Sequence, residues 1–229
     1  MGTIAENIVR LRERIYTRAI KAGRKPEEIT LVAVTKTVES NRIREAREAG
    51  ITAFGENYVQ EAIGKIPHIG EGVTWHMIGR LQTNKVKYVV PVFSMIHSVD
   101  SIRLAEEISE QAIKHEKTMD ILIQVNIGRE NAKAGVTPEE LPQLLETVSS
   151  LNVIIVRGLM TMPPYFSDPE KVRPFFKILR DLRDKNFSGL SDSLPLFHLS
   201  MGMSSDFEVA IDEGATILRI GTAIFGGRK

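Results

Sequence analysis

The chain of 229 residues contains no cysteine, which excludes a disulfide-linked scaffold, a thiolate nucleophile and a metal site with cysteine ligands. It also lacks an uninterrupted apolar run of membrane-spanning length. An excess of charge is missing too, because 30 basic residues balance 29 acidic ones. Neither nucleic acid nor an anionic membrane is therefore expected as a partner. The five histidines show no metal-ligand spacing, so no metal is expected.

The N-terminus is predicted to be a helix rather than a signal peptide. Thr3 and Glu6 have the spacing of a capping box. Apolar residues then recur at helical intervals, at Ile4, Ile8, Leu11, Ile15 and Ala19. With no targeting segment and no cysteine, the sequence predicts a protein of the reducing cytoplasm.

Short apolar runs alternate with longer amphipathic stretches along the rest of the chain. Strands are predicted near residues 30–35, 51–54, 74–78, 95–98, 119–126, 153–159, 196–199 and 216–220. Helices are predicted between them, near 39–49, 57–65, 82–89, 101–115, 138–149, 169–185 and 205–213. This alternation predicts an α/β fold with a parallel sheet, and eight such units predict a single (β/α)8 TIM barrel domain over residues 1–229, with an extra N-terminal helix.

A doubly wound open sheet is the alternative fold. Such a sheet often carries a glycine-rich fingerprint after its first strand, where Thr35, Lys36 and Thr37 stand here. The barrel is therefore favoured.

Lys36 follows a strand-like apolar run, where an ammonium group is costly unless something neutralises or uses it. In a barrel, the carboxyl ends of the strands carry the active site. Val32 and Val34 share a face of the strand with Lys36, so a lysine facing the barrel would be desolvated and its pKa would fall. Its neutral amine could then form a Schiff base with an aldehyde cofactor. The alternative is a lysine that extends from the strand end into solvent.

Arg219 and Gly221 share one face of the last predicted strand. Because the last strand neighbours the first when a barrel closes, Arg219 and Lys36 are expected to converge on one cavity. An arginine there could donate a hydrogen bond to a pyridine nitrogen. The alternative role is an ion pair with an acid inside the barrel.

The segments after the last two predicted strands, 200–206 and 221–226, are rich in glycine, serine and threonine. Barrels frequently bind phosphate through these loops, where glycine lets backbone amides approach the anion. They are a candidate phosphate site, although Ser204 or Ser205 could instead cap the next helix. Asn57, after the second strand, could contact a bound ring or cap the helix that follows it.

Seven strings, in order over nearly the whole chain, point to one family. They are VAVTKT (32–37), FGENYVQE (54–61), WHMIGRLQTNK (75–85), QVNI (124–127), RGLM (157–160), LSMGMS (199–204) and RIGTAIFG (219–226). Together they resemble the pyridoxal phosphate homeostasis proteins, the YggS/PROSC family. Each string is weak alone, whereas the ordered set is highly specific.

This resemblance implies a barrel like the N-terminal domain of alanine racemase, with pyridoxal 5′-phosphate (PLP) bound covalently as an aldimine of Lys36. The other contacts that it implies are Arg219 at the pyridine nitrogen, Asn57 near the cofactor, and Ser200, Gly221 and Thr222 at the phosphate. Lys133 matches a lysine of the family pattern near the site, without a role that the sequence defines.

Three functions are compatible with such a site: a non-catalytic PLP carrier that delivers cofactor to apoenzymes, an amino-acid racemase, and a barrel acting on a sugar phosphate without PLP. A racemase needs an acid–base group on each face of the cofactor, and in racemases of this fold type a second domain brings the opposite tyrosine. The sequence ends at Lys229, soon after the last strand. An arginine at the pyridine nitrogen also weakens the electron sink. We therefore expect a non-catalytic PLP-binding protein, monomeric because the usual racemase dimer contact is missing.

Overall fold

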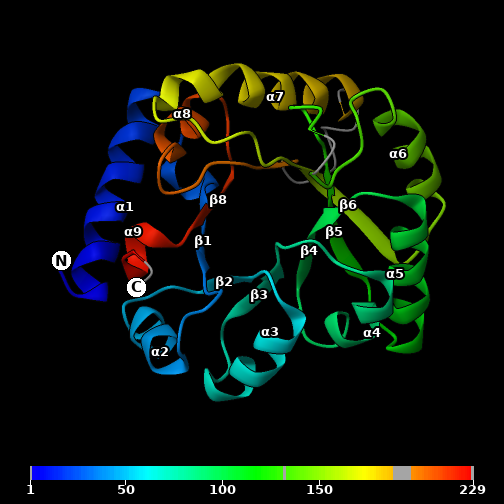
Figure 1. The fold of residues 1–229 in the computed structure, drawn as a ribbon, viewed down its shortest axis with the longest axis horizontal. Helices are drawn as coiled ribbons and strands as arrows, with labels where there is room; N and C mark the ends of the chain where they lie inside the picture. The colour runs from blue at the N-terminus through cyan, green and yellow to red at the C-terminus, as the bar shows by residue number, and fades with distance from the viewer. Residues whose placement is uncertain (1, 131–132, 188–196, 228–229) are drawn as a thin grey trace.

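Eight parallel strands close into a barrel in sequence order, with β8 beside β1 (Figure 1). The computed structural model describes residues 2–130, 133–187 and 197–227. The strands are β1 (Thr30–Val34), β2 (Ala53–Glu56), β3 (Thr74–Met77), β4 (Met95–Val99), β5 (Met119–Gln124), β6 (Ile154–Met160), β7 (His198–Ser200) and β8 (Ile217–Ile220). The predicted (β/α)8 barrel is confirmed.

Helices surround the barrel on its outer side (Figure 1). They are α1 (Ile4–Lys21), α2 (Ser40–Glu48), α3 (Val59–Lys65), α4 (Val86–Val89), α5 (Ile102–Lys114), α6 (Leu141–Ser149), α7 (Arg173–Phe187), α8 (Phe207–Asp212) and α9 (Thr222–Phe225). Short 3-10 helices are η1 (Pro26–Glu28), η2 (Ile66–His68), η3 (Thr83–Lys85) and η4 (Pro169–Val172). None of the helices in the described ranges is long and apolar enough to cross a membrane.

The N-terminal helix α1 covers the barrel where the last helix is short. Its capping box is formed as predicted, because Thr3 Oγ1 accepts from the Glu6 N–H and Glu6 Oε2 accepts from the Thr3 N–H. All five predicted apolar positions of α1 are buried. The helix packs against α2, α8 and α9, and Asn7 donates a side-chain hydrogen bond of 2.9 Å to the carbonyl of Ile224. An N-terminal element thus closes the ring of helices.

The strand boundaries lie within two residues of the sequence prediction, and the shifts are largest at β2 and β7. β2 begins and ends two residues later than predicted, because Ile51 lies in the turn that follows α2, where its N–H donates to the carbonyl of Ala46. Glu56, which lies beyond the predicted strand at 51–54, is fully buried within β2. The strand predicted at 196–199 starts at a residue outside the described ranges, and β7 includes Ser200.

The barrel interior changes from apolar to polar along the strands. One layer is an apolar cluster made of Val32, Ala53, Met95, Leu122, Met160 and Ile217. Side chains alternate along a strand, so residues two apart face the same side. Arg219 therefore faces the interior like Ile217 in β8, and His97 faces it like Met95 in β4. Arg219 and His97 are both buried. The polar layer therefore lies on the carboxyl-terminal side of the apolar one, at the end where barrels carry their active sites.

Candidate functional site

Lys36 lies just beyond the end of β1. Val32 belongs to the interior apolar cluster, and the alternation of the strand from Val32 through Val34 predicts that Lys36 faces the barrel interior. Lys36 is half-buried. It follows Thr35 in a tight turn closed by a hydrogen bond of 2.9 Å from the Val38 N–H to the Thr35 carbonyl. The backbone thus presents this lysine at the mouth of the barrel.

Arg219 lies in the neighbouring strand β8, directly opposite Val32 of β1. Its Nη1 donates to Oγ of Ser200 at 2.6 Å and its Nη2 donates to the carbonyl of Thr161 at 2.9 Å. Burial lowers the pKa of Arg219 to about 10, an effect that nearby Asp206 partly offsets. The guanidinium therefore stays charged at neutral pH. The alternative role in an ion pair inside the barrel is not seen among the described residues, since both hydrogen-bond partners are uncharged.

Two buried histidines extend this hydrogen-bonded chain across the barrel. His97 Nδ1 lies 3.0 Å from Oγ of Ser200, and His97 Nε2 lies 2.9 Å from Nδ1 of His76. Burial lowers the pKa of His76 to about 4 and holds the pKa of His97 well below its ordinary value, so both rings are neutral at pH 7. Arg219 can only donate, so Oγ of Ser200 accepts its hydrogen bond. The Ser200 hydroxyl can then donate to Nδ1 of His97, and the Nε2–H of His97 can donate to Nδ1 of His76.

Ser200 was expected at the phosphate. Its hydroxyl is fully buried and bonded to the guanidinium of Arg219. A direct contact between Ser200 and a phosphate group stays a prediction. The observed bond helps to fix the direction of the neighbouring arginine.

The loops after β7 and β8 lie side by side. Ser204 Oγ accepts a hydrogen bond of 3.2 Å from the N–H of Ala223 in α9, which links the two loops. The expectation that Ser204 or Ser205 caps the next helix is wrong, because Asp206 occupies the N-cap position of α8 and no side-chain cap is formed there. Asp206 instead accepts from the Met203 N–H at 2.7 Å and shapes the loop from within.

Gly221 and Thr222 form the start of α9, at the carboxyl end of β8. Gly221 is the N-cap residue, and Thr222 is exposed as the first helical residue. A Cβ atom added to Gly221 would lie 3.4 Å from Cβ of Val34. The absence of a side chain at Gly221 therefore lets β8 lie close to Val34, in the strand that leads to Lys36.

Asn57 follows β2 at the same end of the barrel and is half-buried. Its expected alternative role as a helix cap is not formed, because Tyr58 is the N-cap residue of α3 and has no side-chain capping bond. The backbone of Asn57 packs closely against Gly79, where an added Cβ would lie 2.4 Å from the Asn57 carbonyl oxygen. Lys133, in the loop after β5, pairs with Glu130 at 2.6 Å.

Sequence reasoning missed a charged cluster behind Lys36. Lys65 in α3 contacts both Glu56 in β2 and Glu61 one turn earlier in α3. The spacing of Glu61 and Lys65, four residues apart on a predicted helix, was the available signal. The cluster was not predicted, because Glu56 was expected after the second strand rather than within it.

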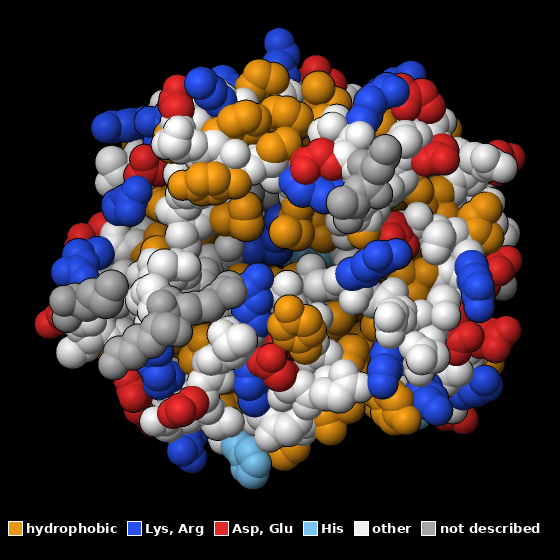
Figure 2. Space-filling view, in the orientation of Figure 1, with side chains coloured by type: hydrophobic (Ala, Val, Ile, Leu, Met, Phe, Trp, Pro, Cys, Tyr) orange, Lys and Arg blue, Asp and Glu red, His pale blue; other side chains and the backbone are white. Residues whose placement is uncertain are grey.

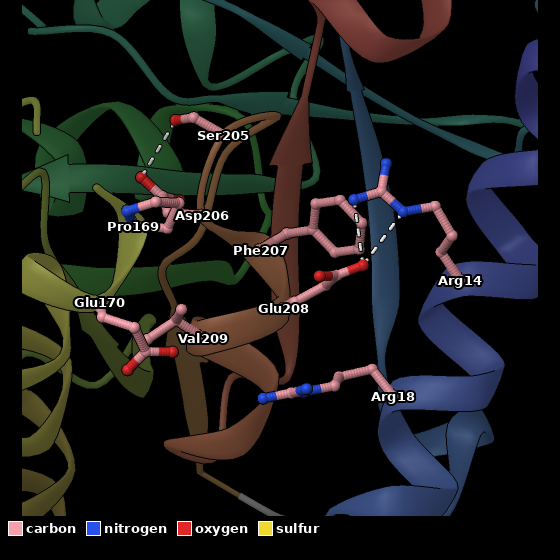
Figure 3. A pocket seen from close by; sticks show the side chains of 9 residues that line it. All are labelled: Arg14, Arg18, Pro169, Glu170, Ser205, Asp206, Phe207, Glu208 and Val209. Carbon is pink, nitrogen blue, oxygen red and sulfur yellow. Dashed lines mark hydrogen bonds and ion pairs between the residues drawn. The ribbon is translucent and has the colours of Figure 1, made fainter. Parts of the chain in front are cut away.

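A hollow opens in the middle of the face seen in Figure 2, and basic side chains gather in it. A separate cavity of about 200 Å³ lies outside the barrel, between α1 and α8. Figure 3 shows Arg14 and Arg18 extending from α1 toward α8, with Glu208 beside Arg14 at 3.0 Å. Arg18 pairs with Asp212. The two arginines that line this cavity are thus paired with carboxylates of α8, and we assign the cavity a structural role.

Comparison with known proteins places the chain in a family. The family model described as "Alanine racemase, N-terminal domain" matches residues 2–229. The pyridoxal phosphate homeostasis protein of Aquifex aeolicus is 48% identical over 225 residues, which cover 98% of each chain. The protein of that name in Escherichia coli K12 is 43% identical over 233 aligned positions, covering 100% of this chain and 98% of the relative. The chain belongs to the pyridoxal phosphate homeostasis protein family.

Solved structures connect this family to a bound cofactor and to a wider group of barrels. PipY of Synechococcus elongatus, solved with PLP bound, superimposes with a TM-score of 0.85 at 36% identity, covering 98% of this chain and 100% of that one. Alanine racemase of Clostridium difficile superimposes with a TM-score of 0.70 at 15% identity, and the match covers 57% of the racemase chain. The second likeness shows that the homeostasis family and the racemases share the barrel fold.

Proposed function

We propose that this protein binds PLP in its one barrel domain, holds it through a Schiff base to Lys36, and serves intracellular PLP homeostasis in the cytoplasm without turning over a substrate. Delivery of PLP to apoenzymes is part of this proposal. The observation that carries it is the placement of Arg219 in β8, beside β1 and opposite Val32, while Lys36 follows the carboxyl end of β1. The PLP bound to PipY, a relative at 36% identity, supports the choice of cofactor.

The residues at the barrel mouth fit the chemistry of PLP. The cofactor has an aldehyde, a pyridine ring and a phosphate, which call for an amine, a hydrogen-bond donor and an anion site. Lys36 supplies the amine, Arg219 supplies a fixed guanidinium, and the linked loops after β7 and β8 supply amides and hydroxyls. At Gly221 an added Cβ would contact Val34 of β1, so the backbone there carries no side chain of its own. We propose that Gly221 and Thr222 receive the phosphate and that Asn57 lies beside the ring.

Arg219 is also the reason to propose binding without catalysis. When bound, PLP supplies an electrophilic carbon and a ring that withdraws electrons best when its nitrogen is protonated. Because its pKa stays near 10 even when buried, Arg219 keeps its proton and donates a hydrogen bond to the nitrogen instead. His76 and His97 remain neutral at pH 7 and offer no second proton to the ring.

A racemase would further need an acid–base group on the face of the cofactor opposite Lys36. A tyrosine performs this task in racemases of this fold, and the four tyrosines of this chain are all exposed: Tyr16, Tyr58, Tyr88 and Tyr165. None of them is enclosed at the barrel mouth. This supports a carrier over an enzyme.

The test of cofactor binding is an absorption spectrum with added PLP, followed by borohydride reduction and peptide mapping. An imine band and a reduced adduct at Lys36 are expected, and Lys36→Ala should lose both. Lys114→Ala, which removes an exposed lysine of α5, should retain them. A protein that stays colourless and takes up no PLP would overturn the proposal and favour a barrel acting on a sugar phosphate.

The test of the non-enzymatic role is exchange of the α-proton of alanine in deuterated water with the PLP-loaded protein. No exchange above that of free PLP is expected. Rapid exchange that disappears in Lys36→Ala would instead establish the racemase-like alternative.

A further inference from the structure

A cluster of charged side chains, partly or fully buried, lies on the outer side of the barrel beside the turn that carries Lys36. Glu56 is fully buried, and its Oε1 lies 2.8 Å from Nζ of Lys65. The same Nζ donates to Oε2 of Glu61 at 2.7 Å and to the carbonyl of Thr35 at 2.8 Å. Three acceptors therefore use the three protons of the ammonium group. We call Glu56, Glu61 and Lys65 the anchor cluster.

The anchor cluster holds the residues on both sides of Lys36. The hydroxyl of Thr35, which is fully buried, donates to Oε1 of Glu56 at 2.8 Å. The backbone N–H of Thr37 donates to Oε2 of Glu61 at 2.8 Å. The contact with Glu56 places the Thr35 side chain on the outer side, and the alternation of β1 predicts that Lys36, the next residue, points inward. The backbone that carries the lysine is thus fixed from behind.

The turn that carries Lys36 needs such support. Thr37, its third residue, has a φ of +61°, a conformation that glycine adopts readily and that costs a β-branched residue about 1–3 kcal/mol. The bond from the Thr37 N–H to Glu61 holds the backbone in that conformation. Burial acts to raise the pKa of Glu61, but the hydrogen bonds from Lys65 and Thr37 outweigh it and lower that pKa. Glu61 therefore stays charged at neutral pH and keeps both contacts.

We propose that the anchor cluster, acting through Lys65, positions Lys36 for attack on the aldehyde of its cofactor. This inference rests on the proposed function. In that step the neutral Nζ of Lys36 forms a C=N bond with the aldehyde carbon, and the aldehyde oxygen leaves as water with the two amine protons. The rate of such a step depends on the approach of the two atoms, so a displaced backbone slows it even where the cofactor still binds. Lys65 is a positioning residue, since it acts through the turn.

The test separates imine formation from binding of the cofactor. In Lys65→Met, the rate constant of imine formation with excess PLP, followed by stopped-flow absorbance, should fall about tenfold. Affinity for pyridoxine 5′-phosphate, which has no aldehyde, should stay within about twofold of the wild type. Lys65→Arg should restore most of the rate, because a guanidinium can reach the same acceptors. Glu61→Gln, a milder change that keeps an acceptor for the Thr37 N–H, should give an intermediate rate.

Lys117→Met is the matched control. Lys117 is a half-buried lysine that bonds the carbonyls of Val90 and Phe93 at the opposite end of the barrel, just before β5. Its loss should lower stability and leave the rate of imine formation unchanged. Wild-type rates in both Lys65→Met and Glu61→Gln would overturn the anchor-cluster inference alone. Absence of any imine in the wild type would overturn the proposed function, and the inference with it.

Discussion

Arg219 donates a hydrogen bond of 2.6 Å to Oγ of Ser200 in the interior of the barrel. The two residues belong to adjacent strands, and the chain of contacts continues through His97 in β4 to His76 in β3. The direction of the guanidinium is therefore set by a hydroxyl on a neighbouring strand. In the proposed carrier, this arrangement aims a permanent donor at the pyridine nitrogen of the cofactor.

Ser200→Ala should lower the free energy of unfolding by about 2 kcal/mol, because it leaves a buried guanidinium N–H without its partner. Urea denaturation measures this loss. Ser98→Ala is the matched control, since Ser98 is equally buried and its hydroxyl has no hydrogen-bond partner in the described part of the chain. The control should be neutral or slightly stabilising. Equal effects of the two variants would contradict the role given to Ser200.

The buried histidines should make the protein less stable as the pH falls from about 6.5 to about 4. The pKa of His76 is about 4 in the folded state and about 6.5 when unfolded, so within this window the unfolded chain binds more protons. The contribution of neutral His76 to the free energy of unfolding is fully present above pH 6.5 and is lost as the pH falls toward 4. The total loss is on the order of 3 kcal/mol for this residue, and His97 acts in the same direction.

Urea unfolding at a series of pH values measures this effect. His76→Gln should flatten the dependence between pH 6.5 and pH 4, whatever its effect on stability at pH 7. His68→Gln, a change at an exposed histidine, should keep the wild-type slope. The assignment fails if His76→Gln and the wild type have parallel curves over the whole window.

Gly221→Ala should weaken PLP binding about tenfold with little loss of stability. The added Cβ would lie 3.4 Å from Cβ of Val34, a contact that the protein tolerates but that fills the space beside the proposed phosphate loops. Fluorescence titration gives the affinity, and pyridoxal without phosphate is the comparison ligand. A larger loss for PLP than for pyridoxal is expected. Equal losses would place the phosphate elsewhere.

The barrel was predictable because its signals are local and repeat along the chain. Each strand is a short apolar run, each helix has an apolar face, and the capping box at Thr3 and Glu6 formed as its spacing indicated. The strict alternation of predicted strands and helices is compatible with only a few arrangements of the strands in a sheet. Predicted strand boundaries were wrong where a contact with a residue elsewhere in the chain decides where the strand ends. Glu56 continues β2 because Lys65, nine residues later, neutralises it, and nothing in the strand itself reveals that pairing.

The positions of the candidate site residues were more predictable than their contacts. Period-two alternation predicted Lys36 and Arg219 on the interior rows of neighbouring strands, and Arg219 is buried there. The bond between Arg219 and Ser200 could not be predicted, because it depends on how far a long side chain reaches within the closed barrel. His76 and His97 are hydrogen-bonded to each other inside the barrel. The hydrogen bonds that join them to Ser200 could not be predicted, because they connect side chains of different strands inside the closed barrel.

Gly202→Ala should lower the free energy of unfolding by about 3 kcal/mol, whereas Gly64→Ala should raise it by about 0.5–1 kcal/mol. Gly202 follows β7 with a φ of +92°, and an added Cβ would lie 2.6 Å from Cβ of Ala210. Its carbonyl also accepts the Arg219 N–H at 3.0 Å, so any shift of the loop disturbs the strand that carries the guanidinium. Gly64 lies in α3, and nothing lies within 4 Å of the added atom. Denaturation of both variants measures the difference. A Gly202→Ala protein as stable as the wild type would show that the loop after β7 adjusts freely, and would remove the ground for treating it as a rigid half of the phosphate site.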